Sequence, residues 1–313
     1  MSSDPLRPGL YLVATPIGNL DDITLRALDV LKRSGRIACE DTRQTQKLLN
    51  HFGITTPTIS CHEHNERTRA VQLIQEIKAG SAVAVVSDAG MPGISDPGSL
   101  LVREAIAAGV HVIPIPGANA ALSALVASGL PTSEFQFLGF LPEKAGARRT
   151  HLEDLADQPR DSAQTLVFYE APHRIAGTLA DIEAVWGPEL RVVAARELTK
   201  IHEEFLRGTV AEVRKELASR DRIRGEFVLL MEAAARPKSG ASLSRDSDTK
   251  PGAPSVEAPG SSRARESISS RVSRLQTEAG LDEKEALKRL ARELGQSKSE
   301  LYRELQRERA RGR

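Results

Sequence analysis

The feature that most limits the fold of this chain is a repeated alternation of short apolar runs with amphipathic segments of helical period. The apolar runs predict strands at residues 10–14, 36–40, 82–86 and 111–115. The amphipathic segments predict helices at residues 24–34, 66–79 and 97–108. Strands that alternate with helices are typical of α/β folds with largely parallel sheets. We therefore expect an α/β domain over residues 1–130.

Residues flanking the predicted helices support their ends. Asn65 and Asp96 precede two of the helices, and both are residue types whose side chains cap helix N-termini. Pro97 suits a first helical turn. Gly80 and Gly109 stand where a left-handed residue ends a helix.

A second group of strands is expected further along the chain, near residues 135–140, 165–169, 191–195 and 227–231. These strands predict a second α/β domain over residues 131–235. Two α/β domains that share a cleft are therefore the expected fold of the first 235 residues.

The remainder of the chain differs in composition and charge. Residues 236–267 contain 8 Ser, 4 Pro and 3 Gly, which predicts a flexible linker spanning roughly 30 Å. Residues 268–313 carry two apolar helical stripes and two capping boxes, Asp282 to Glu285 and Ser297 to Glu300, a pattern that predicts a helix-turn-helix module. Residues 1–235 carry a net charge of −5 and the rest +6. A basic tail of this kind favours a polyanionic partner.

Composition excludes several classes of protein. Of the 313 residues, 40% are hydrophobic and 27% are charged, which excludes a chain that is disordered throughout. No apolar run approaches the ~20 residues that span a bilayer, and the N-terminus lacks the order of a signal peptide, so we expect a cytoplasmic protein with no membrane partner. Cys39 and Cys61 are the only cysteines, too few for a disulfide framework.

Three loops that follow predicted strands and precede helices contain glycine: residues 15–19, 87–98 and 114–120. Ligands of open α/β folds bind at this edge of the sheet, although such loops also serve as tight connections. Asp88 offers a carboxylate to a hydroxyl, an amine or a cation. Neither a Rossmann nor a Walker A glycine pattern is present.

Four polar clusters are further candidates for chemistry, at residues 40–43, 61–65, 169–174 and 196–200. Cys61, His62 and His64 have no second ligand pair at zinc spacing, so no metal site is expected. Helix caps, strand-edge ion pairs and an exposed first helical turn are the structural alternatives for the other clusters.

With these residues in view, the sequence resembles the tetrapyrrole methylase superfamily, and within it the bacterial branch that methylates small-subunit ribosomal RNA. The matching runs lie at residues 10–24, 40–43, 88–98, 116–120, 137–142, 168–174, 196–200 and 225–227. The tail, through residues 288–302, is similar to the small helix-turn-helix domain that follows many of these enzymes. The long linker departs from the family.

The resemblance implies two α/β domains with S-adenosylmethionine in the cleft between them, and a homodimer. It also implies methylation of a cytidine ribose 2′-oxygen in small-subunit (16S) ribosomal RNA, either free or in an assembled subunit. Carried over by motif, the residues expected to line the cofactor are Ile17, Asp88, Met91, Asn119, Ala120, Tyr169 and Leu198.

Methyl transfer to a hydroxyl requires the oxygen to lie in line with the bond that breaks, and benefits from a proton acceptor or a nearby cation. The candidate catalytic residues are Glu170, Glu197 and Lys200. The candidate substrate-binding residues, which include possible phosphate ligands, are Asp41, Arg43, His173, Arg174, Lys298 and Arg303. Asp41 is also a possible proton acceptor.

Two alternatives remain at this point. A methyltransferase of a small tetrapyrrole, or of the diphthamide pathway, would use the same cofactor cleft but gives no role to the basic tail. A ligand-sensing regulator that reads DNA through its helix-turn-helix module is the alternative from another class of protein.

Overall fold

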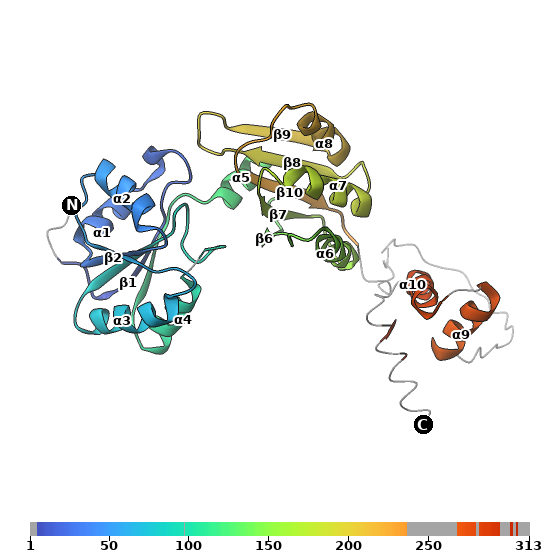
Figure 1. Ribbon diagram of the computed structural model, residues 1–313, viewed down its shortest axis with the longest axis horizontal. Coiled ribbons are helices and arrows are strands. Elements are labelled where there is room, and N and C mark those ends of the chain that lie inside the picture. Colours follow the sequence, from blue (N-terminus) through green and yellow to red (C-terminus); the bar gives the residue numbers. More distant parts are fainter. Residues whose placement is uncertain are drawn as a thin grey trace, which may run out of the picture. The chain divides into compact units, whose positions relative to one another are not determined.

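The computed structural model describes residues 5–96, 98–236, 268–279 and 282–294, together with Leu301, Tyr302 and Leu305 (Figure 1). The chain divides into two compact units, Met1–Arg236 and Pro237–Arg313. We refer to these units as the body and the tail. No helix among the described residues has the length and apolarity that crossing a membrane requires.

The first sheet of the body is wholly parallel, as the sequence predicted. Its strand order is β3-β2-β4-β1-β5. The strands are β1 (Gly9–Val13), β2 (Arg36–Cys39), β3 (Thr58–Ser60), β4 (Ala82–Val86) and β5 (Val112–Ile115). A short 3-10 turn, η1 (Leu20–Asp22), follows β1. Because β1 lies between β4 and β5, the loops after these three strands leave one edge of the sheet side by side.

Helices cover both faces of this sheet. They are α1 (Leu25–Arg33), α2 (Thr42–His51), α3 (Glu66–Lys78) and α4 (Ser99–Ala107). Leu31 of α1 and Leu49 of α2 belong to one buried core, whereas Leu73 of α3 and Leu101 of α4 belong to another. Figure 1 shows α1 and α2 on one side of the strands and α3 and α4 on the other.

The start of α4 differs from the prediction. The helix begins at Ser99 with Gly98 at its N-cap, where φ is +128°, so Asp96 does not cap it. The carboxylate of Glu66 does so instead, because its Oε1 accepts from the backbone N–H groups of Gly98 at 3.0 Å and Leu101 at 2.9 Å. Asn65 occupies the N-cap position of α3 as predicted, but its side chain does not cap the helix and instead accepts from the N–H of His62 at 2.9 Å. Pro97 lies outside the described residues.

The second sheet has the order β6-β7-β10-β8-β9 and is mixed. Its strands are β6 (Phe135–Phe140), β7 (Gln164–Glu170), β8 (Arg191–Arg196), β9 (Glu204–Thr209) and β10 (Phe227–Ala233). Only β6 and β7 pair in parallel, so the prediction of largely parallel pairing is wrong for this half of the body. The short connection between β8 and β9 allows antiparallel pairing, for which no crossover helix is needed.

Four helices accompany the second sheet: α5 (Ala120–Ser128), α6 (Ala145–Asp157), α7 (Ile175–Trp186) and α8 (Val210–Ala218). Leu152, Leu179 and Val213, from α6, α7 and α8, share one core. Leu125 of α5 packs in a separate core with Val193 and Leu230 of the sheet. Both faces of the second sheet are therefore covered.

The described part of the tail contains α9 (Ile268–Ala279) and α10 (Glu283–Leu294). Asp282 caps α10, because its Oδ1 accepts from the N–H of Glu285 at 2.7 Å. Val272 and Leu290 belong to a small buried core of the tail. The predicted linker after Arg236, the Ser297 capping box, and the phosphate ligands Lys298 and Arg303 lie outside the described residues.

Candidate active site

A cavity of about 510 Å³ is lined by the loops after β1, β4 and β5 and by residues of the second sheet. This volume lies in the range of small-molecule and cofactor sites. The loops of the first sheet contribute Ile17, Met91 and Asn119 to its wall, and the second sheet contributes Tyr169 and Phe227. The cavity is thus built from segments that lie far apart in the sequence.

Backbone hydrogen bonds hold two of these loops together. Thr15 and Gly90 exchange two of them, at 2.9 and 3.0 Å. Gly90 has a φ of +75°, and a Cβ atom at this position would lie 3.4 Å from the side chain of Ile17. In the third loop Asn119 caps α5, accepting from the N–H of Leu122 at 3.0 Å. The N-terminus of α5 therefore lies at the cavity.

Six of the seven residues predicted to line the cofactor lie on the cavity wall: Ile17, Met91, Asn119, Ala120, Tyr169 and Leu198. Asp88 is the exception among the seven. Its side chain is exposed and accepts from the N–H of Asp41 at 3.4 Å. The structure thus places Asp88 beside the cavity wall and not on it.

The loop of residues 197–200 joins the two halves of the body. The N–H of Asn19 donates to Thr199 Oγ1 at 3.0 Å, and a Cβ atom on Gly18 would lie 2.5 Å from Lys200 Cγ. Glu197 and Thr199 have φ values of +49° and +65°, a conformation that costs non-glycine residues energy. Such strain persists where the surrounding structure imposes it, often at functional sites.

Lys200 is the cation that this loop brings to the cavity wall. Its Nζ lies 2.9 Å from Glu197 Oε1 and 3.1 Å from Glu226 Oε2. Burial opposes the charge of Lys200, but the bonds to Glu197 and Glu226 outweigh it and raise its pKa. The hydrogen bond from Lys200 in turn lowers the pKa of Glu197. Glu197 is outside the wall and holds Lys200 in its charged form.

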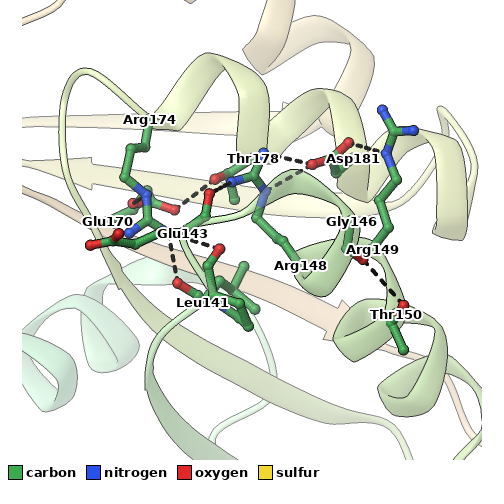
Figure 2. Close-up of polar contacts among 11 residues, drawn as sticks. Leu141, Glu143, Gly146, Arg148, Arg149, Thr150, Glu170, Arg174, Thr178 and Asp181 are labelled. Atoms are coloured by element: carbon green, nitrogen blue, oxygen red, sulfur yellow. Dashed lines mark hydrogen bonds and ion pairs between the residues drawn. The ribbon is translucent and has the colours of Figure 1, made fainter.

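Glu170 also reaches the wall, but its carboxylate is already occupied (Figure 2). It accepts from Thr178 Oγ1 at 2.6 Å and from the N–H of Ala171 at 2.8 Å, and lies 3.2 Å from Arg174 Nε. Arg174 also donates to the carbonyl oxygen of Leu141 at 2.6 Å. The pair therefore fixes the turn after β7, which places exposed His173 on the cavity wall.

Asp41 and Arg43 do not lie on the cavity wall. Asp41 caps α2 through the N–H of Arg43 at 2.8 Å, and the two side chains form an ion pair at 3.0 Å. The helix-cap alternative therefore describes Asp41. Among the described residues no group of His, Cys, Asp or Glu side chains is arranged to hold a metal ion.

The sequence did not single out Glu226, which lies on the cavity wall and pairs with Lys200. It also missed the wall carboxylate of Asp96. Burial raises its pKa to about 6, and the nearby carboxylates of Glu40 and Asp88 add to the shift. The sequence signal was present, since Asp96 lies in the glycine-rich loop, but its position before a helix favoured a cap.

Comparison with known proteins identifies the family. Residues 9–214 match the Tetrapyrrole (Corrin/Porphyrin) Methylases. The chain belongs to this family. The resemblance drawn from the motifs is thereby confirmed, as is the expectation that the chain is a methyltransferase.

Curated relatives are similar over most of the body. The protein named ribosomal RNA small subunit methyltransferase I from Halalkalibacterium halodurans is 55% identical over 223 residues, which cover 71% of this chain and 75% of the relative. The protein of the same name from Pseudomonas aeruginosa is 48% identical over 235 residues, 75% of this chain and 82% of the relative.

Solved structures share the fold at low sequence identity. The methyltransferase CobJ gives a TM-score of 0.54 at 20% identity and covers 71% of this chain and 93% of its own. Diphthine synthase gives 0.53 at 17% identity, covering 72% and 89%. These likenesses agree with an α/β body that contains two sheets.

Proposed function

We propose that this chain transfers a methyl group from S-adenosylmethionine to the 2′-oxygen of a cytidine ribose in small-subunit ribosomal RNA. The observation that carries the proposal is the identity of about half of the aligned residues with proteins named for methylation of that RNA. The cavity supports the proposal, because six of the residues predicted from the family motifs to contact the cofactor line this one cavity.

The residues of the cavity suit S-adenosylmethionine. Ile17, Met91 and Leu198 offer apolar surface to an adenosyl group, and Asn119 offers an amide. Asp96 and Glu226 give the wall carboxylates, which favour a cationic ligand. Bound there, the cofactor supplies an electrophilic methyl group on a positively charged sulfur.

We assign different roles to the three predicted catalytic residues. Lys200 presents a charged ammonium to the cavity, where it binds an RNA phosphate or stabilises negative charge that develops on the ribose oxygen. Glu197 positions Lys200. Glu170, with both oxygens engaged, positions the turn that carries His173. His173, exposed on the wall, is the remaining substrate-binding candidate there.

The tail is proposed to bind the RNA backbone. Residues 236–313 carry a net charge of +6, and α9 and α10 fall within the segment predicted to form a helix-turn-helix module. We propose residues 1–130 and 131–235 as the two methylase domains, with α5 at the end of the first packing on the sheet of the second. We propose residues 236–267 as a linker and 268–313 as the RNA-binding module. The cytoplasm, where ribosomal subunits are made, is the expected compartment.

A homodimer is proposed from the exposed apolar face of α5. Leu122 and Val126, one helical turn apart, are 49% and 76% exposed. Neighbouring exposed apolar side chains of this kind mark protein contacts. The substitution Val126→Glu should convert a dimer into a monomer in analytical ultracentrifugation, and a wild-type chain that sediments as a monomer would contradict the proposal.

The function is tested by offering the full-length protein methyl-labelled S-adenosylmethionine with several acceptors. Small ribosomal subunits, deproteinised small-subunit RNA and a tetrapyrrole are compared. We expect label in RNA from one or both of the first two acceptors. Label in the tetrapyrrole alone, or retention of DNA fragments with no transfer at all, would support one of the alternatives instead.

A further inference from the structure

The strand β6 contains an irregularity next to the cavity. Phe137 pairs with Val167 and Phe140 with Tyr169, so β6 has one more residue than β7 between these two pairs. Such an insertion is a β-bulge, which bends a strand and re-aims a side chain. Gly139, within the bulge, has a φ of +64°, in the left-handed region that glycine adopts readily. Phe140, directly after it, lies on the cavity wall.

The bulge decides which face of the sheet receives the Phe140 ring. Side chains alternate between the two faces of a regular strand. Leu138 packs against the core under α6, α7 and α8, whereas Phe137 packs against the core that includes α5. Regular alternation would send Phe140 to the face of Leu138. Instead its ring contacts that of Tyr169, with centroids 5.8 Å apart, and Tyr169 also contacts Phe137. The extra residue therefore places on the cavity side a ring that regular pairing would place in the core.

A ligand in the cavity can reach Phe140 more fully than the other phenyl and phenol rings of the wall. The side chain of Phe140 is 55% exposed, whereas Phe227 is 2% exposed and Tyr169 is partly buried. Contact with Tyr169 is of the edge type, with 64° between the ring planes. Phe140 therefore offers aromatic surface to a ligand.

The turn after β7 lies beside Phe140. Because β6 and β7 are parallel, their carboxyl ends meet at the same edge of the sheet. Arg174 donates to the carbonyl oxygen of Leu141, the residue after Phe140, at 2.6 Å (Figure 2). This hydrogen bond ties the turn that carries His173 to the end of β6. Phe140 and His173 are both exposed and both line the cavity, so an aromatic ring and a polar side chain lie on adjoining segments of the wall.

We propose that Phe140 stacks on the base of the cytidine whose ribose is methylated. The inference rests on the proposed function. Proteins that recognise RNA bases outside a helix stack them on aromatic side chains. A base held by Phe140 brings its own ribose to the cavity whose wall carries Lys200. Since neighbouring bases cover both faces of a base within a continuous helix, the target cytidine is bound with at least one face unstacked.

The test compares Phe140→Leu with wild type in the full-length protein. Leucine keeps an apolar side chain but has no aromatic face. The affinity for the RNA that wild type methylates is measured with S-adenosylhomocysteine bound, so that no turnover occurs. Losing base–aromatic stacking weakens binding roughly 5- to 150-fold, the equivalent of about 1–3 kcal/mol, so we expect a loss of at least about fivefold. Phe140→Ala should lose at least as much, and Phe140→Tyr, which keeps the ring, should retain most of the affinity.

Two further measurements separate stacking from other roles. The affinity of Phe140→Leu for S-adenosylhomocysteine, measured by calorimetry, should stay within about threefold of wild type, which also shows that the variant is folded; a tenfold change corresponds to about 1.4 kcal/mol. The slope of log RNA affinity against log salt concentration should equal that of wild type, because a phenyl ring releases no counterions from phosphate.

Phe135→Leu is the matched control, since Phe135 begins the same strand, is 44% exposed and is not on the cavity wall. Equal RNA affinities of Phe140→Leu and Phe135→Leu would overturn the inference. So would a loss of S-adenosylhomocysteine affinity above about tenfold with unchanged RNA affinity, which would make Phe140 a cofactor ligand. Wild-type protein that transfers no methyl group to RNA would refute the proposed function, a failure visible before any variant is measured.

Discussion

Replacing Glu66 by alanine should destabilise the body and disturb the cavity at the same time. The side chain of Glu66 is 7% exposed, and one of its oxygens accepts two backbone hydrogen bonds, from Gly98 and Leu101. Leaving a buried donor unsatisfied costs about 1–3 kcal/mol, so losing both bonds should lower the free energy of unfolding by about 3 kcal/mol. For a body of this size that corresponds to a fall in Tm of about 6–12 °C.

Urea unfolding and calorimetry measure this loss, and Glu66→Gln is the informative companion because its amide oxygen can still accept both bonds. We expect Glu66→Gln to lose less than half of the stability that Glu66→Ala loses. The affinity for S-adenosylhomocysteine should also fall in Glu66→Ala, since Gly98 ends the loop whose residues Met91 and Asp96 line the cavity. A Glu66→Ala protein within 0.5 kcal/mol of wild type, about the scatter of neutral surface changes, would refute the reasoning.

Three further outcomes follow from the structure. Lys200→Gln should reduce the single-turnover rate of methyl transfer at least tenfold and leave the affinity for S-adenosylhomocysteine nearly unchanged. Equal losses in rate and affinity would instead make Lys200 a cofactor ligand. Hydrogen bonds from Arg220 and Arg196 lower the pKa of Glu204 to about 2, so the ionised carboxylate stabilises the fold. In urea unfolding, Glu204→Gln should therefore be less stable than wild type at pH 7, and this difference should disappear as the pH falls from 4.5 to 2. Deleting residues 268–313 should weaken RNA binding and flatten its dependence on salt concentration, with unchanged cofactor affinity; an identical salt slope would show that the tail makes no phosphate contacts.

Local patterns predicted much of the first sheet. Residues 82–86 were predicted as a strand and form β4, and the predicted helix 24–34 is α1 with its caps, because Thr24 accepts from the N–H of Ala27. Hydrophobic period and capping are properties of neighbouring residues, so sequence suffices for them. The start of α4 was missed because its cap comes from Glu66, which lies more than thirty residues earlier in the chain.

The second sheet shows a different limit. Its four predicted strands are present, but β9 was not predicted and the pairing is mostly antiparallel. Strand direction depends on which strands become neighbours, and β10 pairs with both β7 and β8, which precede it by tens of residues. An apolar run does not encode such partners.

The sequence motifs predicted most of the residues that line the cavity. They did not predict which charged side chains already have hydrogen-bond or ion-pair partners. Glu170, Glu197 and Arg174 look equally suited to chemistry in the sequence. Only the contacts to Thr178, Lys200 and Leu141 show that their polar atoms are already engaged. Asp96 is the converse, because the sequence predicted a helix cap and the structure places the residue on the cavity wall.

The central claim, methylation of a ribose 2′-oxygen, is tested most directly by identifying the methylated nucleoside. Small-subunit RNA treated with the protein and deuterium-labelled S-adenosylmethionine is digested to nucleosides and analysed by mass spectrometry. The account predicts labelled 2′-O-methylcytidine, in which the added mass stays with the ribose when the glycosidic bond is broken. A label that stays with the base, or that is found on any nucleoside other than cytidine, would contradict it.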